Sequence, residues 1–235
     1  MTTHSFRVAQ SALAETEGRL SDLARPFLDF LPVSGVSIST FGPLLGAETI
    51  SATDARAGRI DELQFDLGEG PCWDALSTRH PVIEPDLATT DSWPAFAEAV
   101  RREEVAAIFA FPLVFGPLEI GAIDLHSTSP AQLTVRQQRQ TLALSAIVSR
   151  ILLRHAVNAG GRSTPSTYSR RLVHQATGMV LAQLETTPDD AYLIIQARAY
   201  AEDRSMREVA EDVIARRISF SVLPEHRTQS DEGAP

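Results

Sequence analysis

The sequence predicts a mixed α/β (α+β) domain with a mainly antiparallel sheet, followed by a smaller all-α domain of three helices. The apolar pattern changes from helical to strand-like at Val33 and returns to helical at Thr134. Further along, a Gly/Ser/Pro-rich segment precedes two helix-start signals. We therefore place the first domain at residues 5–157, a linker at 158–167, the second domain at 168–220 and a disordered tail at 221–235.

Composition restricts the class of protein. The chain has 235 residues, of which 43% are hydrophobic, and this is enough for two folded domains. It has no run of about 18 apolar residues that could span a bilayer, and its N-terminus lacks the layout of a secretory signal. We expect a cytoplasmic protein without membrane contact. The single cysteine, Cys72, excludes an internal disulfide and a multi-cysteine zinc site, and we expect no metal.

Charge is distributed unevenly along the chain. The net charge of -9, taken alone, argues against nucleic acid as a partner. Residues 1–133 hold 8 Arg against 19 acidic residues, whereas residues 134–220 hold 12 Arg against 8 acidic residues and so carry +4. Such asymmetry indicates two segments with different partners.

The first domain should begin and end with a helix. Apolar residues at helical spacing predict helices over residues 5–30, 91–104 and 134–157. Between them, short β-branched stretches bounded by Gly and Pro predict strands at residues 33–40, 47–54, 81–87, 107–115 and 118–127. The first two strands should form a hairpin around the breakers at 42–46, and the last two a hairpin around a tight Gly116-Pro117 turn.

The strand at 107–115 is apolar on both faces, which predicts a central position in a sheet covered by helices on both sides. Pro112 then has to lie at a bulge or at an unpaired position, because proline cannot donate a ladder hydrogen bond.

This order of elements is similar to that of GAF domains, and the stretches "GEGPCWDAL" and "FAFPLVFGPLEIGAIDLH" carry the resemblance over roughly residues 5–157. The resemblance implies a sensor domain with a pocket on one face of its sheet, used for a small ligand, a chromophore or dimerisation. No cofactor is evident, and the identity of a small ligand is left open.

The candidate pocket residues are polar groups on one strand and nearby aromatic side chains. Asp124 and His126 share a strand face with Ile120 and Ala122, which suits polar contacts at a pocket mouth. The alternative is a solvated strand end for these two, and core packing for the aromatic residues. The full set is Trp73, Trp93, Phe96, Phe109, Phe111, Asp124 and His126.

Cys72 invites a catalytic or chromophore-binding interpretation, since it follows the glycine-rich loop at the start of a short helix. We interpret it as a small buried apolar side chain instead. It has no second thiol to complete a redox cycle, and Trp73 stands where bilin attachment usually has a histidine. We therefore expect no catalytic residue and no enzyme activity.

The second domain carries two helix-start signals of the same kind. Thr187 precedes Pro188 with a carboxylate at Asp190, and Ser205 precedes Glu208 in a capping-box spacing. Together with apolar spacing, they delimit three helices at residues 170–184, 188–203 and 206–218, which form a compact bundle.

This segment resembles an ANTAR domain, as shown by "HQATGMVLAQLETTPDDAYLIIQARAYAEDRSMREVAEDVIARR". The resemblance implies a module that binds hairpins in nascent transcripts and favours antitermination. With the first domain, the chain resembles the GAF-plus-ANTAR regulators of actinobacteria. Thr177 and Asp203 depart from the family pattern, which most often has a basic residue and an asparagine there.

The first helix of the bundle has a polar outward stripe. Arg171, Gln175 and Gly178 recur at helical spacing, and apolar residues occupy the opposite side. Such a stripe offers charge, an amide and close backbone approach to RNA; the alternative is that Gly178 lets another helix cross closely. The predicted RNA-binding residues are Arg170, Arg171, His174, Gln175, Thr177, Gly178, Arg204 and Arg207.

We also predict a homodimer through the helix at 134–157, whose stripe of Leu144, Val148, Ile151 and His155 is too long for one small sheet to cover. Two other functions remain open. In one, the helical tail docks on a partner protein and RNA binding has been lost. In the other, the first domain is a redox enzyme, which the lone cysteine disfavours.

Overall fold

The computed structural model describes residues 3–16, 19–41, 45–158 and 170–220. The chain divides into two compact units, residues 1–171 and 172–235. Most of the predicted linker and all of the predicted tail lie outside the described residues.

A five-stranded antiparallel sheet with the strand order β2-β1-β5-β4-β3 forms the centre of the first unit. Both predicted hairpins are confirmed, one joining β1 to β2 and the other joining β4 to β5 through Gly116, whose φ is +57°. The strands are β1 (Gly35–Thr40), β2 (Glu48–Ala52), β3 (Val82–Glu84), β4 (Ala107–Phe115) and β5 (Leu118–Ser127).

Pro112 is accommodated in β4 by the shortness of its neighbour. On one side Pro112 is in register with Ala122 of β5, and the ladder shifts register just after it, between Leu113 and Val114. On the other side β3 pairs with β4 only as far as Ala110. On that side β4 has no partner strand at Pro112, and proline is tolerated at such an edge position.

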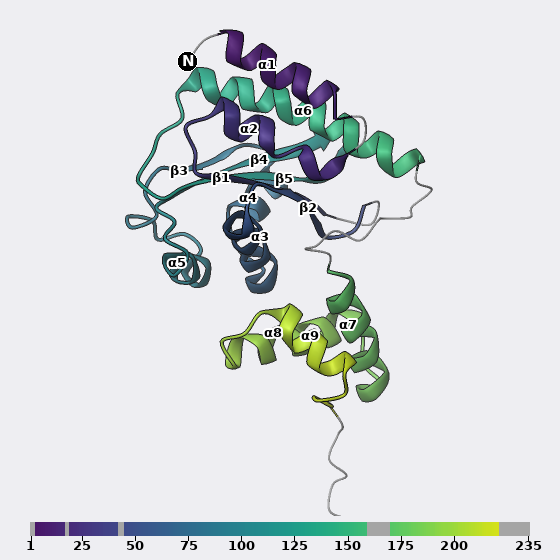
Figure 1. The fold of residues 1–235 in the computed structure, drawn as a ribbon. Coiled ribbons are helices and arrows are strands. Elements are labelled where there is room, and N and C mark those ends of the chain that lie inside the picture. Colours follow the sequence, from purple (N-terminus) through teal and green to yellow (C-terminus); the bar gives the residue numbers. More distant parts are fainter. Residues whose placement is uncertain (1–2, 17–18, 42–44, 159–169, 221–235) are drawn as a thin grey trace, which may run out of the picture. The chain divides into compact units, whose positions relative to one another are not determined.

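One face of the sheet is covered by α1 (Thr3–Ala14), α2 (Arg25–Phe30) and the long α6 (Val135–Asn158), as Figure 1 shows. The residues between the sheet and these helices form one apolar cluster, which includes Phe27, Phe109 and Leu144. A single helix over residues 5–30 was predicted, but the chain breaks after Ala14 and passes through a 3-10 turn at Leu20–Asp22. The break lets α1 and α2 pack against each other.

The opposite face of the sheet is covered by α3 (Ala55–Leu67), α4 (Pro71–Thr78) and α5 (Pro94–Arg101) (Figure 1). The sequence did not predict α3, although Asp54 caps it by accepting a hydrogen bond from the Ala57 N–H, and Gly68 ends it with φ +67°. The hydrophobic pattern did not reveal this helix because Asp61 and Gln64 interrupt the apolar residues on its buried side. Both polar side chains are themselves fully buried.

The second unit is the three-helix bundle that was predicted, formed by α7 (Arg171–Leu184), α8 (Pro188–Ala201) and α9 (Met206–Ile214). Both helix-start signals are confirmed. The Thr187 hydroxyl accepts from the Asp190 N–H, and Ser205 and Glu208 form a complete capping box. The core between the helices consists of Val173, Ala176, Val180, Ala191, Ile195, Ala199, Met206, Val209, Ala210 and Val213.

Candidate functional site

The predicted outward stripe lies on the solvent side of α7. Arg171, His174, Gln175 and Gly178 are all exposed, whereas Val173, Ala176 and Val180 of the same helix are buried in the bundle core. The helical period alone explains this separation, because residues three and four apart share a face. The stripe is the most continuous polar surface on α7.

Gly178 has open space beside it. A Cβ built on this residue meets no heavy atom within 4 Å, so the glycine does not serve as a crossing point for another helix among the described residues. A mid-helix glycine costs roughly 1 kcal/mol relative to alanine, and nothing inside the bundle requires it. Thr177, beside it, is half-buried and its hydroxyl donates to the Val173 carbonyl at 2.8 Å.

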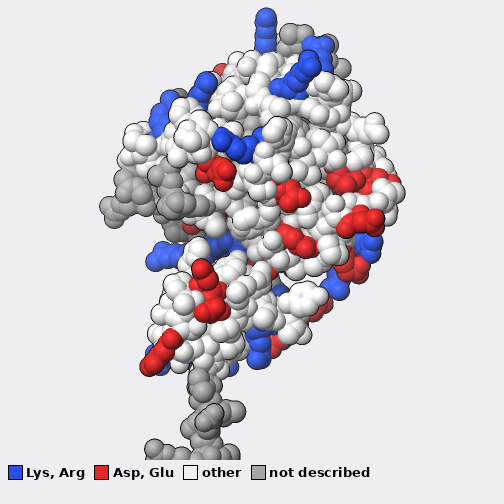
Figure 2. Space-filling model, turned by 180° about the vertical axis from the view of Figure 1, so that it is seen from behind, with Lys and Arg blue, Asp and Glu red and all other residues white. Residues whose placement is uncertain are grey.

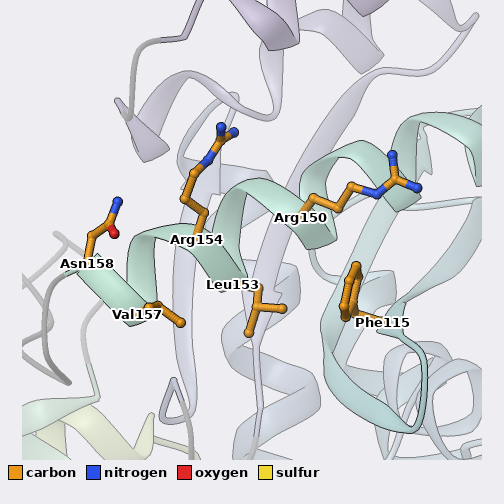
Figure 3. Close-up of a pocket in the computed structure, with 6 residues that line it drawn as sticks. All are labelled: Phe115, Arg150, Leu153, Arg154, Val157 and Asn158. Atoms are coloured by element: carbon orange, nitrogen blue, oxygen red, sulfur yellow. The ribbon is translucent and has the colours of Figure 1, made fainter.

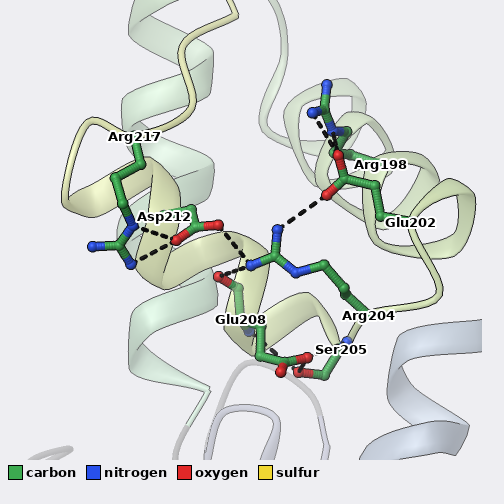
Figure 4. A network of polar contacts seen from close by, with 7 residues as sticks. All are labelled: Arg198, Glu202, Arg204, Ser205, Glu208, Asp212 and Arg217. Atoms are coloured by element: carbon green, nitrogen blue, oxygen red, sulfur yellow. Dashed lines mark hydrogen bonds and ion pairs between the residues drawn. The ribbon is translucent and has the colours of Figure 1, made fainter.

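Arg204 holds the bundle together instead of pointing to solvent. Its guanidinium donates to Glu202 at 3.0 Å, to Asp212 at 2.6 Å and to the Glu208 carbonyl at 3.2 Å, and so joins the end of α8 to α9 (Figure 4). Arg198 pairs with the same Glu202, and Arg217 with the same Asp212. Hydrogen bonds from these arginines lower the pKa of both carboxyl groups.

Two more of the predicted RNA-binding arginines, Arg207 and Arg170, also contact acidic side chains. Arg207 lies 3.6 Å from Glu211 on the same helix. Arg170 belongs to the first unit, where only 6% of its surface is exposed. Its guanidinium lies 2.9 Å from the carboxylate of Asp66 and 4.1 Å from the centre of the Phe65 ring. Arg170 and Arg204 therefore lie apart from the exposed stripe.

The positive charge that the sequence indicated is not on the three-helix bundle. Residues 171–220, counted from the first residue of α7, hold 6 Arg against 8 acidic residues, a net charge of -2. The excess of residues 134–220 comes instead from α6 and the segment after it. Along its whole length α6 carries four arginines and neither Asp nor Glu.

The predicted pocket residues of the first unit separate onto two faces of the sheet. Asp124 and His126 face α3 and α4, and Trp73 and Phe96 lie on the same side. Trp93 also packs there, and its indole N–H donates to Asp74 at 2.9 Å. Phe109 and Phe111 of β4 lie opposite Leu125 and Ile123 of β5, the residues that alternate with Asp124 and His126. They therefore pack under α6 on the opposite face of the sheet.

A buried polar cluster lies between α3 and the sheet. Asp61, Gln64 and Asp124 are all buried, and the Gln64 amide donates to Asp124 at 3.1 Å. The other Gln64 amide atom, its oxygen, accepts from the Cys72 N–H at 2.8 Å. Thr49 donates to one oxygen of Asp61. The second oxygens of Asp61 and Asp124 have no hydrogen-bond partner among the described residues.

Burial changes the acidity of this cluster. It raises the pKa of Asp61 to about 6 and the pKa of Asp124 well above its usual value, and repulsion from Asp61 raises the latter further. The same burial raises the pKa of the Cys72 thiol, so Cys72 is a buried, protonated side chain. His126 is buried against Gly35, and burial lowers its pKa to about 4.

The outward side of α6 has two features that the sequence analysis missed. On this side apolar residues recur at alternating spacings of seven and four and form a strip along the helix. Val157, the last residue of the strip, is 70% exposed. Near the end of the strip, a groove of about 410 Å³ lies between α6 and Phe115 (Figure 3). The strip consists of Val135, Leu142, Ala146, Leu153 and Val157.

The predicted dimer stripe of α6 is already covered within the unit. Leu144, Val148 and Ile151 are buried in the apolar cluster beneath the helix, so the reasoning that part of this stripe must meet a second copy was wrong. The sheet beneath α6 is long enough to cover the stripe, because the helix lies along β4.

Two further searches concern the described residues only. In that part of the chain no helix is both long and apolar enough to cross a membrane. Within the same residues, no group of three or more His, Cys, Asp or Glu side chains is arranged to hold a metal ion.

Comparison with protein families matches residues 12–152 to the GAF domain and residues 168–214 to the ANTAR domain. No curated protein matches the chain significantly.

Solved structures show the fold of the first unit. The chain is similar to the GAF domain of a phosphoenolpyruvate-protein phosphotransferase from Coxiella burnetii, with a TM-score of 0.54 and 11% identity over 68% of this chain and 96% of that one. The corresponding domain from Acinetobacter gives 0.53 and 11%, over 69% and 100%. The chromophore-binding domain of a bacteriophytochrome from R. palustris gives 0.51 and 14%, over 67% and 61%.

Proposed function

The chain belongs to the GAF-domain family, and because an ANTAR domain follows its GAF domain, we propose that it is a non-enzymatic, cytoplasmic antitermination regulator that binds hairpins in nascent transcripts. The GAF domain is the sensor and the ANTAR domain is the output. The observation that carries the proposal is the exposed stripe of Arg171, His174, Gln175 and Gly178 on α7. The helix keeps a costly glycine there although nothing in the bundle needs it.

The chemistry of the stripe suits an RNA hairpin. An arginine contacts phosphate, a glutamine amide both donates to and accepts from an unpaired base, and a glycine lets the sugar-phosphate backbone approach closely. Arg207, half-exposed on α9, is a further contact in this proposal. Arg170 and Arg204 are left out because each lies within 3.0 Å of a carboxylate and donates a hydrogen bond to it, whereas Arg207 is half-exposed and 3.6 Å from Glu211.

The test is filter binding of the full-length protein to RNA that carries two adjacent hairpins. We expect Gly178→Leu and Gln175→Ala to weaken binding at least tenfold, since the leucine blocks backbone approach and the alanine removes the amide. Gly178→Leu should not unfold the bundle, because the added side chain meets open space. Ala197→Leu, which also places a leucine on an exposed helical position, is the matched control. Unchanged affinity in both stripe variants would reject the proposal.

One observation favours the alternative, in which the helical domain docks on a partner protein. Leu193 and Tyr200 are exposed on α8, and Tyr200 is 73% exposed. Exposed apolar side chains of this size suit a protein contact. If RNA binding is absent in the unmodified protein and Tyr200→Ala disrupts regulation in cells, this alternative replaces the first.

We propose that the protein is a homodimer and that the exposed apolar strip of α6 forms the contact. Its spacing continues for the length of the helix, which suits isologous packing against the same helix of a second copy. Leu142→Glu combined with Val157→Glu should give monomers that keep their fold, as measured by sedimentation at micromolar concentration. A monomeric unmodified protein would contradict this proposal.

A further inference from the structure

RNA binding requires positive surface, because phosphate neutralisation and counterion release provide most of the non-specific affinity. The three-helix domain does not have this surface. Its net charge over residues 171–220 is -2, and four of its six arginines lie within 4 Å of a carboxylate. The four are Arg198, Arg204, Arg207 and Arg217.

The long helix α6 of the GAF domain has the opposite character. Its four arginines are exposed, and α6 itself contains no acidic residue. Arg139, Arg150 and Arg154 take part in none of the ion pairs found between described residues. Elsewhere in this unit exposed arginines do pair with acids, for example Arg25 with Asp29 and Arg101 with Glu98.

The four arginines of α6 form one row. Arg136 and Arg139 are three residues apart, Arg150 and Arg154 are four apart, and the two pairs are separated by three helical turns, so all four lie on one side of the helix. From first to last the row spans about 27 Å at 1.5 Å per residue. Figure 2 shows arginine surface gathered over the part of the GAF domain where α1 and α6 lie.

The row overlaps one margin of the apolar strip. Arg139 stands at helical spacing between Val135 and Leu142, and Arg150 between Ala146 and Leu153. Figure 3 shows that Arg150 and Arg154 line the same groove as Leu153, Val157 and Phe115. A dimer formed through the strip would therefore bring Arg139 and Arg150 to the edge of the contact, whereas Arg136 and Arg154 lie further round the helix.

We infer that the arginine row of α6 is a second RNA-contacting surface, which binds the sugar-phosphate backbone and supplies the electrostatic attraction that the ANTAR domain lacks. The inference rests on the proposed function, since it assigns to the GAF domain a share in binding the same RNA. A row of exposed arginines on a helix without acidic residues matches a line of phosphates and not the edges of bases. The row should therefore increase affinity without reading sequence, and the α7 stripe should select the hairpin.

The experiment measures RNA affinity of the full-length protein across a series of salt concentrations. The variant Arg136→Gln, Arg139→Gln, Arg150→Gln, Arg154→Gln should bind paired hairpins at least tenfold more weakly at low salt. The slope of log affinity against log salt should fall by about two units or more, since each lost phosphate contact removes about 0.7 to 0.9. An unstructured RNA of equal length should lose affinity by the same factor.

Two controls separate charge from structure. Arg25→Gln with Arg101→Gln removes two exposed arginines that already pair with carboxylates, and should leave affinity and slope unchanged. Replacing the same four α6 arginines by lysine keeps the charge and should retain most of the slope, because phosphate contacts accept either cation.

The outcomes distinguish the two proposals. If the glutamine variant binds RNA like the unmodified protein while Gly178→Leu does not, the inference about α6 is overturned and the proposed function stands. If the unmodified protein binds no RNA even at low salt, both fail. If the glutamine variant loses affinity only because it dissociates into monomers in sedimentation, the inference is also overturned, since the row would then act through assembly.

Discussion

The two faces of the GAF sheet are built differently. Beneath α1, α2 and α6 the interface is an apolar cluster with Phe109, Phe111 and Leu144 at its centre. Beneath α3 and α4 the sheet carries Asp124, which meets Gln64 of α3 close to Asp61. Burial of carboxyl groups without a cation costs stability, whereas burial of apolar side chains provides it. The first face stabilises the domain, and the second retains polar groups at a cost.

The largest effect should come from the apolar face. Phe111→Ala removes a fully buried ring and should lower the free energy of unfolding by about 3–5 kcal/mol. The measurement is urea unfolding followed by far-ultraviolet circular dichroism. Phe115→Ala, on the same strand but 43% exposed, should cost less than about 1 kcal/mol. Equal losses for the two variants would mean that burial of the Phe111 ring does not stabilise the apolar face as described.

A smaller effect should come from the carboxyl groups and should depend on pH. Because the pKa of Asp124 is raised in the folded state, its contribution to stability is fully present below the unfolded pKa of about 3.9 and is lost as pH rises toward the folded value. The loss is at most about 1.4 kcal/mol per pH unit. Asp61 behaves in the same way but completes its change near pH 6.

The informative window for this test is pH 6.5 to 8. The lowered pKa of His126 makes its contribution grow as pH rises from about 4 to 6.5, which opposes the carboxyl groups there. Above that range, the unmodified protein should lose stability with rising pH relative to Asp124→Asn for as long as Asp124 stays protonated in the folded state. We expect the variant to be the more stable of the two at the upper end of this window. Parallel stability curves would show that Asp124 is ionised in the folded protein.

The smallest effect should come from the thiol beside the carboxyl groups. Cys72 is fully buried with a raised pKa, so it should react with Ellman's reagent only when the domain unfolds. Cys72→Ala should change the free energy of unfolding by about 1 kcal/mol and leave RNA binding unaltered. Fast labelling under native conditions would indicate that the polar face opens to solvent.

Local patterns in the sequence predicted much of this architecture. The strands, the two hairpins, the long helix and the three-helix bundle were all predicted, because alternation, helical spacing and capping act between residues close in the chain. For the same reason the exposure of Gln175 and Gly178 was correct. The helix α3 was missed because its buried side includes Asp61 and Gln64, which no hydrophobic pattern can place inside.

The sequence by itself determined which faces each helix and strand has, since that depends only on backbone periodicity. The tertiary structure decided what each face meets. It placed Phe111 and Asp124 on opposite sides of one sheet, and it covered the stripe of α6 that had been predicted to form a dimer. It also engaged Arg170 and Arg204 with carboxylates and left the arginines of α6 exposed. Counting charges cannot make this distinction, because ion pairing depends on which residues distant in sequence are brought within a few ångströms of each other.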